Sequence, residues 1–253
     1  MAPATRATRA TRPTRPTRAA SAAPLTFDGF PTGTFRFLRG VTQYNEQIWF
    51  NAHRALYDQF YVPPALALVA ALGPKLRQVV SKDIDFEARV GGSMVKIQTD
   101  PKHDKKPFKT YIGLRFWERA LKKQAATGFF LRLGKDRLFM GAGVGQFQKA
   151  QLDAYRAAVL DEEQGAALVL TAQAVLASDK KYGLGGRGSS RMPKGFPAKH
   201  PRAEYLKYDG LFVGFETRVP KEARSAAFVD YCAAHFAAFY PITKWLHGAV
   251  LKK

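Results

Sequence analysis

The chain has 253 residues, with 40 Lys and Arg against 20 Asp and Glu, which gives a formal charge of +20 and a pI near 10.2. With 46% hydrophobic and 13% aromatic residues it carries enough apolar material for a folded core, so its composition excludes a wholly disordered basic protein. The single cysteine, Cys232, excludes an intramolecular disulfide and a multi-cysteine metal centre, and it fits a reducing, cytoplasmic location.

Residues 1–24 form a basic arm rich in Ala, Thr, Arg and Pro. Five Thr-Arg-Ala or Thr-Arg-Pro triplets run from Thr5 to Ala19 without an acidic residue. Such a segment cannot bury enough surface to offset the entropy of ordering, so we expect a disordered arm that either binds polyanions or acts as a solubilising tail. Without its arginines, 35 basic residues remain against 20 acidic ones, so most of the positive charge belongs to the rest of the chain.

Hydropathy gives no sign of a membrane span. No stretch reaches the roughly 20 apolar residues that a span needs, and the most apolar one, residues 62–73, contains Pro63 and Pro64. We therefore expect a soluble protein without a membrane partner.

Helical spacing dominates the chain directly after the arm. Apolar residues recur at this spacing over residues 34–41, 44–61 and 65–80, and Asn45 is expected to cap the second of these helices. The Pro63-Pro64 pair is expected to end or bend that helix.

The middle of the chain alternates like strands instead. The alternation predicts strands over residues 83–90, 94–98, 111–118, 129–133, 138–141 and 210–218. Helices are expected over residues 150–160, 165–177 and from Phe228 onward, with a long loop over residues 178–201. Short connections favour antiparallel neighbours, so we predict a single α+β domain over residues 25–253, with helices on its N- and C-terminal sides.

One basic cluster occupies residues 100–109, between two predicted strands. It holds four lysines, two aspartates and a histidine. Lys102, Lys105 and Lys109 are candidate anion contacts, and Asp104 could orient a lysine or transfer a proton. The alternative is a solvated basic turn whose acidic residues only balance charge.

A second basic cluster runs over residues 187–207, with six cations against the single acid Glu204. Arg191 and Lys194 are its candidate anion contacts, and His200 is a candidate proton-transfer group. Aromatic residues lie among the cations of both clusters, a combination that suits single-stranded nucleic acid, although strand alternation would turn many of these rings into the core.

Weaker patterns do not indicate a cofactor or a metal. The glycines of residues 139–146 lack the spacing of a dinucleotide-binding loop. Asp83, Asp85 and Glu87 share one strand face, which suits Mg²⁺ or Mn²⁺ but is equally explained by an exposed face. The five histidines form no close metal-binding pair, so we expect neither metal nor cofactor.

Several short segments keep a recognisable order along the chain. They are Phe35-Arg-Phe-Leu38, residues 45–50 ending in Trp49-Phe50, Tyr57, Asp104-Lys-Lys-Pro-Phe-Lys-Thr110, Arg191-Met-Pro-Lys-Gly-Phe196, His200-Pro201, Leu206-Lys207 and Tyr240-Pro-Ile. Together they resemble a widespread family of uncharacterised conserved proteins of bacteria and fungi, and they cover almost everything after the arm. The resemblance implies an α+β domain and marks the same two basic clusters, but it implies no particular chemistry.

The chain departs from the family pattern just before Asp104. The family usually has Arg-Asp followed by Arg-Phe-Ser, where this chain has Gln98, Thr99, Asp100, Pro101 and Lys102. An arginine clamp is therefore missing or replaced by Lys96 and Lys102, which lack the guanidinium fork.

The sequence thus favours a protein that binds nucleic acid or another phosphate polyanion. We expect the two basic clusters to face each other across one end of the sheet. One alternative is an enzyme for a small phosphorylated or carboxylated substrate, with Asp104 or His200 transferring protons. Another is a structural role, in which Asp104 pairs with Arg191.

Overall fold

The computed structural model describes residues 25–100, 102, 105–118 and 127–251, and the basic arm lies outside them. The described residues form a six-stranded antiparallel sheet in the order β1-β2-β3-β4-β6-β5. Its strands are β1 (Ile84–Asp85), β2 (Ile112–Glu118), β3 (Gly128–Leu133), β4 (Arg137–Val144), β5 (Gly183–Arg187) and β6 (Tyr208–Arg218).

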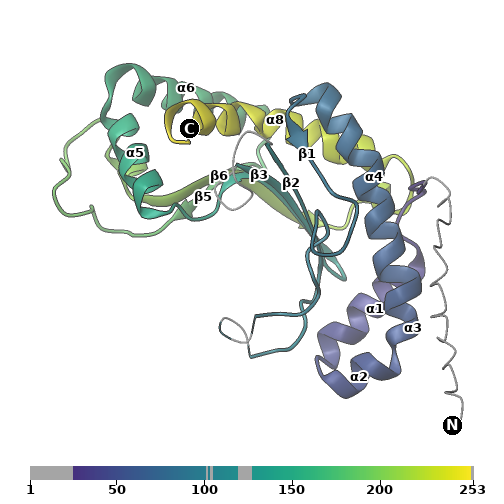
Figure 1. Ribbon diagram of the computed structural model, residues 1–253. Helices are drawn as coiled ribbons and strands as arrows, with labels where there is room; N and C mark the ends of the chain where they lie inside the picture. The colour runs from purple at the N-terminus through teal and green to yellow at the C-terminus, as the bar shows by residue number, and fades with distance from the viewer. Residues whose placement is uncertain (1–24, 101, 103–104, 119–126, 252–253) are drawn as a thin grey trace, which may run out of the picture.

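Helices come from both sides of the sheet in sequence. Before it lie α1 (Thr32–Gln43), α2 (Gln47–Ala52), α3 (Arg54–Leu56), the π-helical turn η1 (Tyr57–Tyr61) and α4 (Val62–Val79). After β4 lie α5 (Lys149–Leu160), α6 (Glu162–Ser178), α7 (Ala203–Leu206), the 3-10 turn η2 (Lys221–Arg224) and α8 (Phe228–Ala249). The predicted α+β class, with helices at the N- and C-terminal sides of an antiparallel sheet, is confirmed (Figure 1).

A central part of the core lies between α8 and one face of the sheet, and the same cluster continues through α1 and α4. Phe236 in α8 contacts the rings of Phe116 in β2 and Phe129 in β3, with ring centroids 6.5 and 5.5 Å apart. All three side chains are fully buried, because alternate residues of each strand point toward the helices. Figure 1 shows no helix over the opposite face of the central strands.

The Pro63-Pro64 pair, expected to end or bend the N-terminal helix, does not end it, because η1 runs directly into α4. Both prolines stand in the first turn of α4, directly after η1, so carbonyls of the preceding turn lose a donor. In a regular helix the Phe60 carbonyl would accept from residue 64, and Pro64 has no N–H to donate. Thr34 Oγ1 donates to that carbonyl instead, at 2.5 Å, so a residue from α1 satisfies the group that the proline leaves open.

The resulting continuous helix, Arg54–Val79, is longer than the sequence analysis allowed. Its 26 residues meet the length and apolarity of a membrane span by composition alone. Leu68, Leu72 and Leu76 are fully buried, and 39% of the most apolar window of this helix is buried inside the structure.

The strands differ from the prediction mainly at the edges of the sheet. β5 lies in the segment expected to be a loop, because its glycines hide the strand pattern. Gly185 is required there, since a Cβ would lie 2.1 Å from Cζ of the Phe212 ring. The strand expected over residues 83–90 shortens to two residues, and residues 94–98 form only isolated bridges.

Replacing Thr34 by Val should lower the free energy of unfolding by about 1–3 kcal/mol, because the part-buried Phe60 carbonyl is left without a donor. Chemical denaturation measures this difference. Thr42→Val is the matched control, since the Thr42 hydroxyl also bonds a helix carbonyl, that of Leu38, at 2.6 Å, but the N–H of Thr42 remains there to serve that carbonyl. Equal losses in both variants would contradict the assignment.

Candidate functional site

The two basic clusters lie at opposite ends of the strands. The first basic segment, residues 100–109, leads into β2, which begins at Ile112. Pairings through β3 and β4 connect Ile112 to Thr217 near the end of β6. The second basic segment, residues 187–207, starts at Arg187, which pairs with Tyr208 at the beginning of β6. The expectation that the segments face each other across one end of the sheet is therefore wrong, and Figure 1 shows them apart, one near α1 and α2 and the other beside α5.

Phe108 fixes the first basic segment to the N-terminal helices. Asn45 Nδ2 donates to the Phe108 carbonyl at 2.7 Å, and Asn45 Oδ1 accepts from the Phe108 N–H at 3.0 Å. The Phe108 ring stacks on Phe50 of α2 with centroids 4.4 Å apart. Asn45 therefore does not cap α2, whose N-cap is Glu46. Its side-chain amide instead bonds both the N–H and the carbonyl of Phe108, which lies far along the chain.

The lysines of the first basic segment divide into two groups. Lys109 Nζ donates to the carbonyl of Lys96 at 3.0 Å and also to that of Gln98, so its ammonium group holds the segment together. Lys102 and Lys105 are exposed, and their side chains have no partner among the residues that the structure describes. Asp104, predicted to orient a lysine or transfer a proton, lies outside the described residues.

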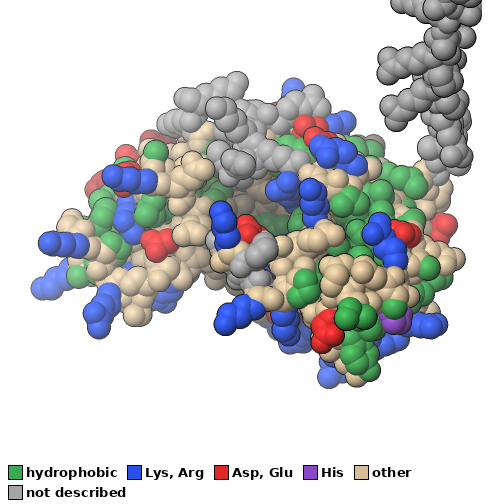
Figure 2. All heavy atoms as spheres, turned by 60° about the horizontal axis from the view of Figure 1, so that its bottom comes forward, with side chains coloured by type: hydrophobic (Ala, Val, Ile, Leu, Met, Phe, Trp, Pro, Cys, Tyr) green, Lys and Arg blue, Asp and Glu red, His purple; other side chains and the backbone are tan. Residues whose placement is uncertain are grey.

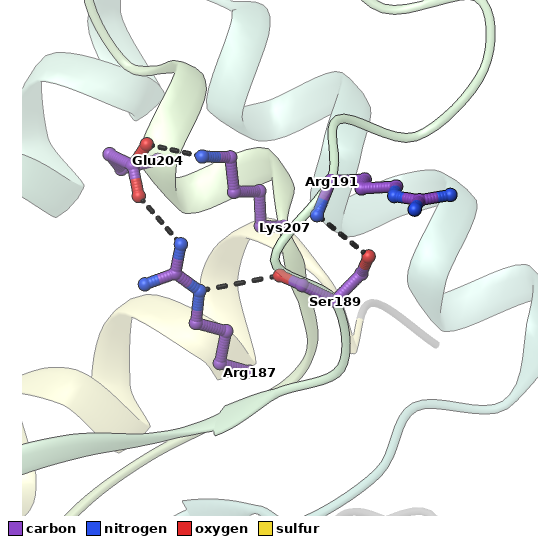
Figure 3. A network of polar contacts seen from close by, with 5 residues as sticks. All are labelled: Arg187, Ser189, Arg191, Glu204 and Lys207. Atoms are coloured by element: carbon purple, nitrogen blue, oxygen red, sulfur yellow. Dashed lines mark hydrogen bonds and ion pairs between the residues drawn. The ribbon is translucent and has the colours of Figure 1, made fainter.

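Glu204 binds two cations of the second basic segment (Figure 3). Its carboxylate accepts from Lys207 Nζ at 2.5 Å and from Arg187 Nη2 at 3.0 Å. The hydrogen bond from Lys207 and the charges of both cations hold the pKa of Glu204 below its ordinary value. Arg187 also donates to the Ser189 carbonyl at 3.3 Å, and Ser189 Oγ accepts from the Arg191 N–H at 3.0 Å.

Arg202 attaches the same segment to the end of α5. Its guanidinium donates to the carbonyl of Val159 at 2.7 Å and to those of Leu160 and Asp161 at 3.1 Å each. Carbonyls at a helix C-terminus lack intrahelical donors and carry partial negative charge, so an arginine is well suited to them. Arg156 of α5 lies over the Phe196 ring, 5.3 Å from its centroid, and adds a second contact.

Three cations of the second basic segment face the solvent. Arg191, Lys194 and Lys199 are exposed, and none has a side-chain ion pair or hydrogen bond within the described part of the chain. Figure 3 shows the Arg191 side chain pointing away from the Glu204 network that holds its neighbours. His200 accepts the Arg202 N–H through Nδ1 at 3.1 Å, so this nitrogen serves the turn.

The acidic residues near β1 and the glycine-rich residues of β4 have the following surroundings in the structure. Asp85 lies 3.5 Å from Arg77, Glu87 lies 2.5 Å from Arg89, and the described residues contain no group of three potential metal ligands. Residues 139–144 belong to β4, which is antiparallel to both neighbours, so a dinucleotide-binding loop is excluded there. Cys232 is fully buried and burial raises its thiol pKa, which argues against a nucleophile.

His235 of α8 is held among aromatic rings. Its Nδ1 lies 2.5 Å from the Tyr182 hydroxyl, its Nε2 lies 3.4 Å from Lys181 Nζ, and the Phe215 ring is 4.6 Å away between centroids. Burial, followed by the charge of Lys181, lowers the pKa of His235 from 6.5 to about 4. The neutral imidazole therefore belongs to the packing of α8 against the start of β5.

The free face of the sheet, which the sequence did not indicate, carries two hollows. One has a volume of about 470 Å³ and the other about 390 Å³, and Arg132 and Phe139 line both. Figure 2 shows this side of the molecule hollowed, with Lys and Arg side chains at its borders. The signal was present in the strands, where Phe130, Arg132 and Phe139 alternate with buried residues, but their grouping depends on the register of several strands.

Residues 33–245 match the family described as conserved hypothetical protein DUF2461. The chain belongs to this family. The resemblance noted in the sequence is thereby confirmed at the level of the family, and the match includes both basic segments and the whole sheet. No curated protein matches the chain.

Replacing Arg202 by Ala should lower the free energy of unfolding by about 2 kcal/mol, because three carbonyls at the end of α5 lose a charged donor. Lys199→Ala, in the same segment, should change it by less than about 0.5 kcal/mol. Denaturant titration of both variants measures the difference. Similar values would show that the segment is not anchored as described.

Acidification should weaken the fold through His235. The unfolded chain takes up a proton as pH falls through 6.5, whereas the folded protein resists until about 4, so the stability contribution of the neutral imidazole is present above 6.5 and is lost between these values. Unfolding free energies of the wild type and His235→Gln across this window measure the effect. The variant should lose less stability on acidification, and a parallel loss in both would rule out His235 as the cause.

Proposed function

We propose that the protein binds a phosphate-bearing polyanion, and that nucleic acid is the class that fits best. The contacts are Lys102 and Lys105 of the first basic segment and Arg191, Lys194 and Lys199 of the second. Lys109, predicted as a direct contact, is assigned to holding the first segment instead. The excess of 40 basic over 20 acidic residues supports a polyanionic partner.

The observation that carries the proposal is that the cations of the second basic segment fall into two groups with different contacts. Arg187, Arg202 and Lys207 bind the protein itself, and the other three cations stay exposed. Because the backbone is already anchored, less conformational entropy is lost when the exposed cations meet phosphates. Phosphate binding then releases counterions, which favours association at low salt.

The spacing of the cations favours a polymer over a small ligand. The second basic segment borders the beginning of β6, whereas the first leads into β2 at a point level with the far end of that 11-residue strand, so a small molecule cannot contact both. An extended polyanion can. For the enzyme alternative, Nδ1 of His200 serves the turn, and the other candidate, Asp104, lies outside the described residues. For the same reason the structural alternative, in which Asp104 pairs with Arg191, stays a prediction.

Alanine at Arg191, Lys194 and Lys199 should weaken binding to a single-stranded oligonucleotide and flatten its salt dependence. The slope of log Kobs against log salt should become less steep by about 2, because each lost phosphate contact on a single strand removes about 0.7. Fluorescence anisotropy across a salt series measures both quantities. The full chain is used with Arg6, Arg9, Arg12, Arg15 and Arg18 changed to Gln, so that the arm does not mask the result.

A charge-matched control separates site from net charge. Lys82, Lys221 and Lys244 are exposed and lie away from both basic segments in sequence, and their triple alanine variant removes the same charge. The control should retain most of the affinity and a steeper slope than the site variant. Equal slopes and affinities for the two variants, or salt-independent binding, would contradict the proposal.

A further inference from the structure

The free face of the sheet carries an aromatic cluster that the core does not use. Phe130 of β3, Phe139 of β4 and Phe212 of β6 are partly exposed and lie outside the hydrophobic core cluster. The Phe130 and Phe139 rings stack with centroids 5.7 Å apart, and Phe212 meets them edge-on at 5.6 and 6.3 Å. We call these three residues the phenylalanine platform.

Glycines let the rings of the platform lie along the sheet. A Cβ at Gly141 would stand 2.7 Å from Cε2 of Phe130, and one at Gly185 would stand 2.1 Å from Cζ of Phe212. The rings therefore lean over bare backbone of the neighbouring strand, instead of standing away from it. Any larger residue at these positions would lift the rings and narrow the hollows.

Arginine side chains lie on the same face as the platform. The exposed Arg132 guanidinium lies 5.8 Å from the Phe139 centroid and 5.3 Å from that of Tyr111, and it borders both hollows. Glu216, an acid on this face, is neutralised by Arg137 at 2.8 Å. Planar aromatic surface next to guanidinium groups matches a ligand that combines flat rings with phosphate.

The second basic segment leads directly into the strand that carries Phe212. That segment joins β6 at Tyr208, and Phe212 follows four residues later, which is about 13 Å along a strand. A chain of nucleotides that places bases on the platform could therefore extend toward the exposed cations of that segment.

We propose that the phenylalanine platform stacks unpaired bases, so that the polyanion is single-stranded nucleic acid lying across the free face of the sheet. This inference rests on the proposed function and names its ligand class. A duplex hides the faces of its bases, whereas a single strand exposes them to aromatic side chains.

The test compares two oligonucleotides of equal length and charge, a base-bearing single strand and an abasic strand of about 16 units. The full chain with the five arm arginines changed to Gln should bind the base-bearing strand at least about tenfold more tightly. Changing Phe130, Phe139 and Phe212 together to Leu should remove this preference and leave abasic binding unchanged. Phe86→Leu, a partly buried ring that packs against Gly73, is the matched control and should keep it.

Thermal melting shows whether the triple variant is folded. If it is not, a variant with a single substitution replaces it. Phe139→Leu alone should reduce the preference for bases about fivefold. A nucleoside monophosphate should compete weakly, because it offers one base and no series of phosphates. If it binds as tightly as the strand, the ligand is a free nucleotide and the inference fails.

The failures of the two proposals differ. Equal, salt-sensitive binding of both strands, or an undiminished preference in the Leu variants, would overturn base stacking and leave polyanion binding standing. Preference for bases without salt dependence would overturn phosphate recognition by the basic segments. No binding of either strand would overturn both.

Discussion

The packing of α8 against one face of the sheet determines what the other face can do. Phe236 and its neighbours bury the inward residues of the central strands, so the fold obtains its core from one side of the sheet. The outward residues of these strands do not pack against α8, and at those positions the chain carries phenylalanines, arginines and glycines. Burial of one face and the aromatic and cationic side chains of the other follow from the same two-residue period.

Electrostatics in the second basic segment shows a similar separation of tasks. Glu204 and the carbonyls at the end of α5 take up three cations, and this fixes the backbone that displays the other three. A net charge of +20 alone would suit a tail as well as a binding site. Anchoring of the backbone favours the binding site that we propose, because a fixed array of cations loses less entropy on binding than a loose one.

Local patterns in the sequence were sufficient for most of the fold. Periodicity identified α5, α6 and α8, and alternation identified β2, β3, β4 and β6. These local patterns failed where residues distant in the sequence determine the structure. Thr34 of α1 accommodates Pro64, and the ring of Phe212 requires the glycine at position 185 that hid β5.

The candidate site was only partly predictable for the same reason. Charge clustering located both basic segments, but the partners of Arg202 lie more than 40 residues away, at separations of 41 to 43. Asn45 resembled a helix cap because its true partner, Phe108, is 63 residues distant. The phenylalanine platform combines β3, β4 and β6, so only their register shows that its members are neighbours.

The central claim is that nucleic acid lies across the free face of the sheet. Ultraviolet crosslinking of the full chain to a single-stranded oligonucleotide, followed by mass spectrometry of the crosslinked peptides, tests it most directly. The account predicts crosslinks at Phe130, Phe139 or Phe212, since these rings contact bases. Crosslinks confined to residues 1–24, or to the helices that cover the opposite face, would contradict it.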